Sequence, residues 1–352
     1  ELVAGMGDGY TGFWADLDCG PGPVTAFRFD MDCNEVAECA EESHRPMREG
    51  FASRWPGLMH ACGHDGHAAV GLGLAEVLVS IRRHLRGRIR LIFQPAEEGA
   101  RGALPMSEAG AVDGVDVLFG FHIGFKAEGP GSLICGTQGF LATTKRDVLF
   151  SGVPAHAGAA PEEGKDALLA ACSAVVNLHA ISRNGKGGTR IAVGRLEGGE
   201  ARNVIPASAR LFMETRGETT ELDAYMTAES ERILRASADL WGCACEWRTV
   251  GNSAGGGSSP ELARLIATVA EAMGGWKTVI PMSGFGATED FACLMSRVQA
   301  SGGLASYLQV GTDRAAGHHS DRFDFDETCL GRALELLARL AVRMAGGGQE
   351  DT

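Results

Sequence analysis

The sequence predicts an α/β domain that is interrupted by a smaller, inserted α+β domain. Three observations support this architecture. Short apolar segments alternate with helical periods between residues 20 and 140, a β-α-β-β-α-β series follows, and clusters of polar residues flank that series on both sides. The alternation is typical of a sheet covered by helices, and the series is typical of the ferredoxin-like arrangement. We expect a main domain of residues 1–141 and 255–352 and an inserted domain of residues 142–254.

Each element of the main domain is expected from its apolar pattern. Short apolar runs predict strands, whereas apolar residues that recur every three or four positions predict a helix. In order, these are a strand at Val24–Phe29, a helix at Ala68–Ser80, and strands at Ile89–Phe93 and Val115–His122. Functional side chains in such sheets gather at strand ends, which is where Asp30, Glu97 and His122 fall.

The elements of the inserted domain are predicted in the same way. The Gly- and Ser-rich segment Gly251–Ser259 would be the hinge through which the chain returns to the main domain. The apolar positions of Ala167–Leu178 fit either a plain core or an interface between protomers. The expected elements are strands at Lys145–Ser151, Thr189–Leu196, Ala207–Thr215 and Cys243–Val250, and helices at Gly164–Ser182 and Glu218–Leu240.

Residues 59–67, with the sequence MHACGHDGH, predict a metal site. Glycines at 63 and 66 let the backbone turn sharply, so that neighbouring side chains can converge. Thiolate, imidazole and carboxylate are ligands of Zn²⁺ and other first-row divalent metals. A lone histidine is more often a core or capping residue, but this density of donors, with further clusters downstream, favours metal binding.

Those further clusters indicate the kind of site. An apolar strand leads into the Gln-Pro-Ala-Glu-Glu-Gly motif of residues 94–99, and adjacent glutamates in extended backbone point to opposite sides. Glu98 or Glu97 can therefore bind metal while the other acts as a general base, whereas a solvated acidic turn poorly explains the apolar strand before it. His122 lies inside an apolar run, where a core histidine is the alternative, and the His318–His319 pair follows much later.

Three acidic residues are candidates for supporting roles. Asp30 and Asp32 follow the first long strand and could orient ligand histidines through hydrogen bonds. Glu289, which precedes Asp290, fits either such a role or a purely structural one.

The motifs, in this order, resemble those of the di-metal amidohydrolases, a family that includes the aminoacylases and the indole-acetyl-amino-acid hydrolases. The resemblance extends from about residue 20 to 340 and implies a catalytic domain with a zinc-peptidase-like mixed sheet and flanking helices. Segments such as Ser43-His44-Arg45-Pro46 and Ala142-Thr143-Thr144-Lys145 resemble the members that hydrolyse aminobenzoyl-glutamate. This implies cleavage of p-aminobenzoyl-glutamate to p-aminobenzoate and glutamate.

The resemblance also implies a role for each candidate in the catalytic domain. Glu97 would be the catalytic base. Two divalent ions per subunit would be held, and they are Mn²⁺ by resemblance or Zn²⁺ by the preference of a cysteine ligand for softer metals. The implied ligands are Cys62, His64, Glu98, His122 and His319.

By the same resemblance, the inserted domain completes the active site of a partner subunit in a homodimer. His156 would polarise the scissile carbonyl, although a surface or capping histidine is the alternative. Asn203, with Arg202, would hold the substrate carboxylate, although Asn also adopts turn geometry for local reasons. Whether a homologous B subunit takes part is left open.

Composition excludes several function classes. A formal net charge of −13 argues against nucleic acid and anionic membranes as partners. No apolar stretch reaches the ~18 residues of a membrane span, and we recognise no signal peptide. The ten cysteines lack disulfide-like spacing, which favours a reducing compartment, and we expect a cytoplasmic protein.

Two other functions fit the same residues. An aminoacylase or dipeptidase that acts on a different N-acyl amino acid would keep every metal ligand. A non-catalytic, metal-binding partner subunit is the alternative outside the enzymes. Glu97 argues against that alternative, because a binding protein has no use for a base beside its ligands.

Overall fold

The computed structural model describes residues 11–345, and the chain divides into two compact units. One unit consists of the residues up to Gly139 and those from Gly257 onward, and the other is Phe140–Gly256. The boundaries expected from the sequence, 142 and 254, each lie two residues inside the limits of the second unit.

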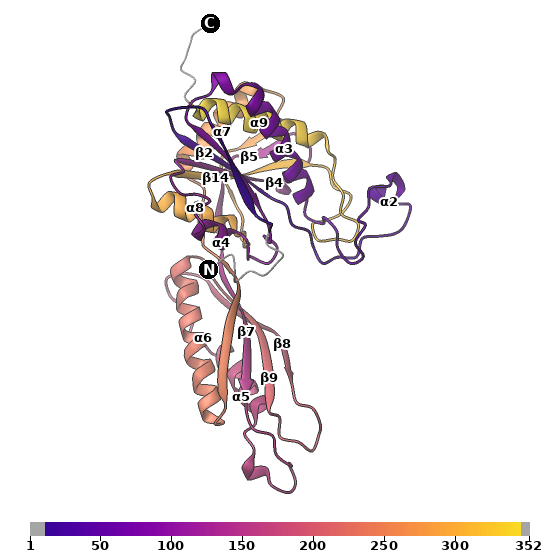
Figure 1. The fold of residues 1–352 in the computed structure, drawn as a ribbon, viewed down its shortest axis with the longest axis vertical. Coiled ribbons are helices and arrows are strands. Elements are labelled where there is room, and N and C mark those ends of the chain that lie inside the picture. Colours follow the sequence, from indigo (N-terminus) through magenta and orange to yellow (C-terminus); the bar gives the residue numbers. More distant parts are fainter. Residues whose placement is uncertain (1–10, 346–352) are drawn as a thin grey trace. The chain divides into compact units, whose positions relative to one another are not determined.

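The first unit is built on a seven-stranded mixed sheet with the strand order β1-β3-β2-β4-β14-β5-β12 (Figure 1). Its central strands are parallel, whereas β1 and β5 run antiparallel to their neighbours β3 and β14. A second, three-stranded sheet has the order β11-β6-β13. Its strands β6 and β11 lie where the sequence passes from one unit to the other. The strands are β1 (Phe13–Asp18), β2 (Val24–Asp30), β3 (Arg88–Gln94), β4 (Val117–Glu128), β5 (Ser132–Ile134), β6 (Thr137–Phe140), β11 (Gly256–Gly257), β12 (Thr278–Ile280), β13 (Ser283–Gly284) and β14 (Leu304–Thr312).

Helices cover both faces of the large sheet. On one face α3 packs against α9, which also contacts α7, and on the other face α4 packs against α8 (Figure 1). The short α2 (Arg45–Glu49) lies in the long connection between β2 and α3. The remaining helices are α3 (His64–Ser80), α4 (Ala103–Glu108), α7 (Pro260–Met273), α8 (Phe291–Ala300) and α9 (Thr328–Met344).

Burial explains why the central strands read as continuous apolar runs. Parallel strands covered on both faces have no solvent side, and every residue of β2 from Thr25 to Asp30 is buried. Phe27 stacks on Phe119 with 5.1 Å between ring centroids, and Phe29 contacts Phe121 at 5.8 Å. These contacts fix β2 against β4 and so fix the positions of the polar residues at their ends.

Helix α3 begins four residues earlier than the predicted Ala68. Gly63, with φ of +86°, turns the chain into the helix in a conformation that L side chains rarely adopt. As a result His64 and His67 belong to the first helical turn and are held by the helix.

The second unit confirms the predicted ferredoxin-like arrangement. Its four strands form an antiparallel sheet of order β10-β7-β9-β8, with α5 and α6 packed against it. Asp166 and Thr219 cap these helices by accepting hydrogen bonds from the backbone N–H of Leu169 and Leu222. The elements are β7 (Ala142–Ser151), α5 (Ala167–His179), β8 (Thr189–Gly198), β9 (Ser208–Gly217), α6 (Thr220–Leu240) and β10 (Ala244–Ser253).

The predicted return hinge at Gly251–Ser259 is only partly irregular. Gly251, Asn252 and Ser253 continue β10 and pair with Lys145, Thr144 and Thr143 of β7. The chain then passes through β11 to α7.

Two residues fasten the points where the chain leaves and re-enters the first unit. The backbone N–H of Ser258 donates to the carbonyl oxygen of Thr137 at 2.8 Å, and the N–H of Thr137 donates to Oγ of Ser258 at 2.9 Å. Across residues 11–345 no helix is both long and apolar enough to cross a membrane.

Candidate metal centre

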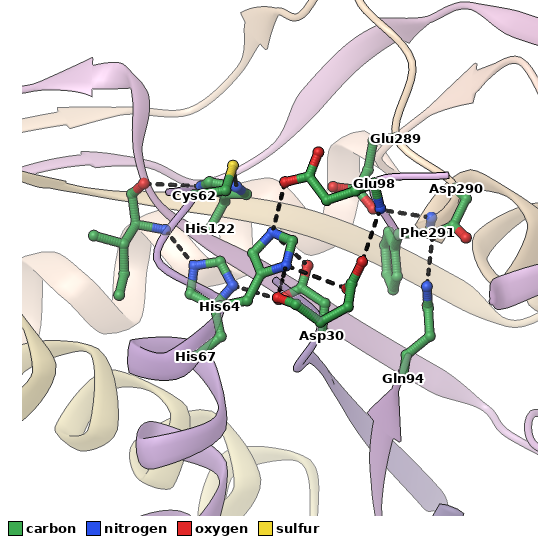
Figure 2. A network of polar contacts seen from close by, with 12 residues as sticks. Asp30, Cys62, His64, His67, Gln94, Glu98, His122, Glu289, Asp290 and Phe291 are labelled. Carbon is green, nitrogen blue, oxygen red and sulfur yellow. Dashed lines mark hydrogen bonds and ion pairs between the residues drawn. The ribbon is translucent and has the colours of Figure 1, made fainter. Parts of the chain in front are cut away.

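The candidate ligands in the first unit come from five separate segments of the chain. Figure 2 shows Asp30, Cys62, His64, Glu98 and His122 close together. β2 leads to Asp30 and Asp32, β3 leads to Glu97 and Glu98, and His122 lies on β4. Cys62 and His64 come from the loop before α3 and its first turn, and His319 follows β14. Because β2, β3 and β4 are parallel, their carboxyl ends meet, which is the usual place for a site in such a sheet.

The predicted metal ligands fall into two groups of donor atoms that share one residue. Two groups of potential ligand atoms, each within 4.8 Å of one another, are Cys62 with His64 and His122, and Cys62 with Glu98 and His319. Both groups include Cys62, so one sulfur faces two sets of donors.

Hydrogen bonds fix the direction of two of the histidine rings. Nδ1 of His64 lies 3.1 Å from the carbonyl oxygen of Asp32, and Nδ1 of His122 lies 2.8 Å from that of Ile123. A carbonyl oxygen only accepts, so both Nδ1 atoms carry protons and each Nε2 is left to bind a cation.

Three buried polar atoms in this cluster lack a hydrogen-bond partner among residues 11–345. They are Oδ1 of Asp32, Nε2 of His64 and Oε1 of Glu98, and the last two lie 3.9 Å apart. Unpartnered buried polar atoms are costly and call for an explanation such as an ion. Although burial opposes it, Asp30, Asp32 and Glu98 raise the pKa of His64 to about 9, so the surroundings of this ring favour positive charge. The donor set fits a divalent cation.

The thiol of Cys62 responds to the same surroundings in the opposite sense. Burial and the nearby carboxylates of Glu98 and Glu97 raise its pKa well above the usual value. A cation among these donors would offset both effects, since a coordinated thiol is deprotonated.

Glu97 stands between the ligand cluster and a pair of buried acids. It forms one group with His64 and Glu98 and another with Glu289 and Asp290. Burial, and then the charges of Glu289 and Asp290, raise the pKa of the Glu97 carboxyl well above its usual value. A carboxylate with raised proton affinity is suited to accept a proton.

A buried network lies behind these residues, and all three acids predicted to have supporting roles contact its members or the ligands. Asp30 accepts a hydrogen bond from Nδ1 of His67 and pairs with Arg28, while Oδ2 of Asp32 accepts from the N–H of Glu98 at 3.1 Å. Glu289 accepts from Arg28 at 3.0 Å and from the Tyr307 hydroxyl at 2.6 Å.

Sequence reasoning missed four residues of this network: Arg28, His67, Gln94 and Tyr307. Arg28 donates from Nε to Oε1 of Gln94 at 2.8 Å, and Gln94 donates to Asp290 at 2.7 Å. Asp290 also accepts from the N–H of Ala103 and so ties α8 to the start of α4. An arginine in an otherwise apolar strand was the one signal that could have identified the network.

His318 was also missed, although it is adjacent to the predicted ligand His319. Its Nδ1 lies 3.5 Å from Sγ of Cys62, and its Nε2 accepts from the N–H of Phe125 at 3.2 Å. Burial, Arg314 and His319 lower the pKa of His318 to about 3, so the ring is neutral. His319 and Phe125 both have positive φ, +64° and +63°, which is rare for non-glycine residues and occurs often at functional sites.

The remaining candidates, His156, Arg202 and Asn203, belong to the second unit and are exposed. His156 forms a β-bridge with Val204, and the N–H of Ala157 donates to the carbonyl of Asn203 at 3.0 Å. Nδ1 of His156 accepts from the N–H groups of Gly158 and Ala159, both at 3.2 Å. Its Nε2 therefore carries the proton and can donate. His156 and Asn203 are thus brought together on one surface of this unit.

Comparison with known sequences extends over nearly the whole chain. The family described as Peptidase family M20/M25/M40 matches residues 26–343. Over 344 residues the chain is 46% identical to one of the subunits of p-aminobenzoyl-glutamate hydrolase from Escherichia coli (strain K12), covering 97% of this chain and 79% of that protein. Indole-3-acetyl-aspartic acid hydrolase of Enterobacter agglomerans is also 46% identical, over 336 residues that cover 95% of this chain and 77% of that protein.

Solved structures show the same fold. Aminobenzoyl-glutamate utilization protein from Klebsiella pneumoniae superposes with a TM-score of 0.78 at 38% identity, covering 94% of this chain and 74% of that one. A Bacillus subtilis protein described as a dinuclear metal-binding peptidase from the M20 family has a TM-score of 0.67 at 26% identity, with coverages of 95% and 85%.

Proposed function

Because the chain belongs to peptidase family M20/M25/M40, we propose that it is a metal-dependent amidohydrolase that cleaves p-aminobenzoyl-glutamate to p-aminobenzoate and glutamate. One observation supports metal-dependent hydrolysis. Two buried atoms without a hydrogen-bond partner, Nε2 of His64 and Oε1 of Glu98, lie in a cluster of potential metal ligands beside Glu97. The similarity to the E. coli hydrolase supports the substrate.

Two divalent ions would be held by Cys62, His64, Glu98, His122 and His319. Cys62 would contribute to both sets of ligands, because its sulfur belongs to both groups of donor atoms. When bound, the ions would lower the pKa of a water towards ~7 and polarise the amide carbonyl. Likeness to a dinuclear M20 peptidase supports the number of ions. A thiolate ligand favours Zn²⁺, whereas the resemblance noted in the sequence favours Mn²⁺.

The protein's own residues would carry the proton. Glu97 would take it from the attacking water and deliver it to the nitrogen of the departing glutamate, which is general acid–base catalysis. Asp32 would hold His64 through its carbonyl oxygen, and Asp30 would hold His67. Glu289 would support Glu97 from the buried side.

We further propose that the second unit serves the site of a partner subunit. His156 would donate its Nε2 proton to the oxygen of the scissile carbonyl, and Asn203 with Arg202 would hold the substrate carboxylate. The hydrogen bond that joins their two loops supports a shared role. The exposed side chains of Leu169 and Val176 on α5, with β8 as a sheet edge, support a homodimer through this unit. A homologous B subunit would be a further partner.

A second candidate substrate has equal sequence support. The chain is as similar to the indole-3-acetyl-aspartic acid hydrolase as to the E. coli protein. Both names describe an aromatic acyl group joined by an amide to an acidic amino acid, so this chemical class is common to the two proposals. An aminoacylase or dipeptidase activity is the broader alternative, and a non-catalytic metal-binding subunit would leave Glu97 without a use.

Hydrolysis assays separate these alternatives. The purified protein would be loaded with Mn²⁺ or Zn²⁺ and given p-aminobenzoyl-glutamate, indole-3-acetyl-aspartate, an N-acetyl amino acid and a dipeptide, each with and without chelator. We expect chelator-sensitive release of p-aminobenzoate with the highest kcat/KM. Preference for another substrate would move the assignment within the amidohydrolases, and inactivity towards all four would favour the non-catalytic alternative or a required B subunit.

We place the protein in a reducing, cytoplasmic environment. All ten cysteines lie in the described part of the chain, and no disulfide joins any two of them there, which supports a compartment where disulfides do not persist.

A further inference from the structure

Two histidine nitrogens lie at the same distance from the sulfur of Cys62. Nε2 of His122 and Nδ1 of His318 are each 3.5 Å from Sγ. Distance alone does not distinguish a ligand from a hydrogen-bond donor, but the second nitrogen of each ring does.

His122 presents a lone pair to the site. Its Nδ1 lies 2.8 Å from the carbonyl oxygen of Ile123 and must carry the proton. Its Nε2 is therefore free to bind the same ion as the sulfur.

His318 presents a proton instead. The backbone N–H of Phe125 donates to its Nε2 at 3.2 Å, so that nitrogen holds the lone pair. A neutral imidazole has one N–H and one acceptor nitrogen, and the N–H of His318 is therefore on Nδ1, directed at Sγ. Among residues 11–345, the groups of potential metal ligands do not include His318.

The surroundings of His318 hold this orientation. Its ring lies between Phe323 and Phe125, with centroid distances of 5.0 and 5.3 Å. Gly124 and Phe125 have φ values of +74° and +63°, an uncommon pair that places the Phe125 N–H against Nε2. Backbone in this region persists only where the surrounding structure imposes it.

We propose that His318 is a positioning residue that donates an N–H···S hydrogen bond to the Cys62 thiolate. The bond aims the sulfur at the metal pair and reduces the electron density that it gives to the ions. This inference rests on the proposed metal site. Residues that hold ligands through such outer contacts typically contribute about 10- to 100-fold to metal affinity.

The test uses cobalt as a spectroscopic probe and a matched pair of variants. In His318→Gln the side-chain oxygen can replace the acceptor Nε2, but the donor to sulfur is lost. In His318→Asn the side-chain NH₂ can replace the donor Nδ1. The full-length protein, freed of metal and loaded with Co²⁺, is measured for its thiolate-to-cobalt charge-transfer band and for Co²⁺ affinity. Thermal unfolding checks that each variant folds.

We expect the band of His318→Gln to move to longer wavelength, because loss of the hydrogen bond raises the energy of the sulfur lone pairs. Co²⁺ affinity should fall about 10- to 100-fold, because the lost orientation of the sulfur outweighs the stronger electron donation of a thiolate without the hydrogen bond. His318→Asn should restore both quantities most of the way. His318→Phe, which keeps the contacts with Phe125 and Phe323, should show the same band shift as His318→Gln. It serves as the test variant if His318→Gln does not fold.

Three results would overturn the proposal, and they are distinguishable. An unshifted band in both His318→Gln and His318→Phe would contradict the hydrogen bond to sulfur but not the proposed metal site. Equal losses in the Gln and Asn variants assign His318 a packing role. Failure of the wild-type protein to bind Co²⁺ with a thiolate band contradicts the proposed metal site itself.

Discussion

Arg28 and Asp30 form an ion pair of 2.6 Å between Nη1 and Oδ2, and both side chains are completely buried. The guanidinium also pairs with Glu289 and Asp290, at 3.0 and 3.2 Å. One cation thus holds three acids in place beneath the ligand cluster. Loss of one partner from such an arrangement leaves the others charged and unpaired in the interior.

Arg28→Met should therefore destabilise the protein by about 3–5 kcal/mol. The comparison is Arg297→Met, which removes the exposed ion pair with Asp113 and should cost less than about 1 kcal/mol. Urea unfolding of the metal-free proteins gives both values. Equal effects of the two substitutions would show that the buried network is not a source of stability.

Cys62→Ala should abolish metal occupancy at one or both sites, because its sulfur faces both groups of donors. Cys135→Ala is the control, since this cysteine is equally buried but belongs to none of the donor groups found among residues 11–345. Elemental analysis after dialysis measures the ions per chain. Two ions retained in Cys62→Ala would contradict a role of Cys62 in both sets of ligands.

Substitution of the neighbouring residues Glu97 and Glu98 should have different effects on metal content. Glu97→Gln should keep its metals and lose turnover by about 10²–10⁴-fold, the usual contribution of a general base. Glu98→Gln should lose metal affinity as well, because it removes a charged ligand. The two measurements are metal content and kcat on the same preparations. A loss of less than tenfold in a metal-loaded Glu97→Gln would mean that another group accepts the proton.

Mixing two inactive variants tests which subunit supplies His156 to an active site. If His156 serves the partner's site, a heterodimer of His156→Ala and Glu97→Gln chains contains one intact site and should regain about half of the wild-type activity, as expected for a twofold dimer. Differently tagged chains allow the heterodimer to be isolated. No activity in a verified heterodimer would assign His156 to its own subunit or to the surface.

Stability should also depend on pH through the pair Asp16–Arg90, which joins β1 to β3. Hydrogen bonds from Arg90, at 2.7 and 2.8 Å, lower the pKa of Asp16 below 3.8. A carboxyl whose pKa is lowered by folding stabilises the protein above its unfolded pKa and loses that contribution as the pH falls through the folded value. The free energy of unfolding should therefore fall less in Asp16→Asn than in wild type between pH 7 and about pH 3. The difference should be below about 1 kcal/mol, because the pair is partly exposed.

The sequence predicted elements and candidate ligands whose signals are local. Strands buried on both faces, the ferredoxin-like series and the donor motif of residues 59–67 each depend on residues close together in the chain. β1 was not predicted, because Phe13–Asp18 is an exposed edge strand without a clear apolar pattern. Arg28 within an apolar strand was a signal of a buried network, but its partners could not be predicted, because Glu289 and Asp290 lie 261 and 262 residues away.

The choice between His318 and His319 shows a second limit. The roles that we propose for the two side chains differ because the backbone at His319 has φ of +64° and because Phe125 donates its N–H to His318. Neither condition can be predicted from a local pattern of residue types. Resemblance proposes His319 as the ligand, and the hydrogen bonds support the separate role that we propose for its neighbour.

The reciprocal hydrogen bonds between Thr137 and Ser258 have an evolutionary consequence. Because the two connections to the inserted unit are fastened side by side, this whole unit occupies the topological place of a surface turn. Insertions at such positions are tolerated because the host keeps its own core and its ends stay together. Changes in the length or sequence of the insert can therefore leave the core of the first unit, and the candidate ligands that it positions, unchanged.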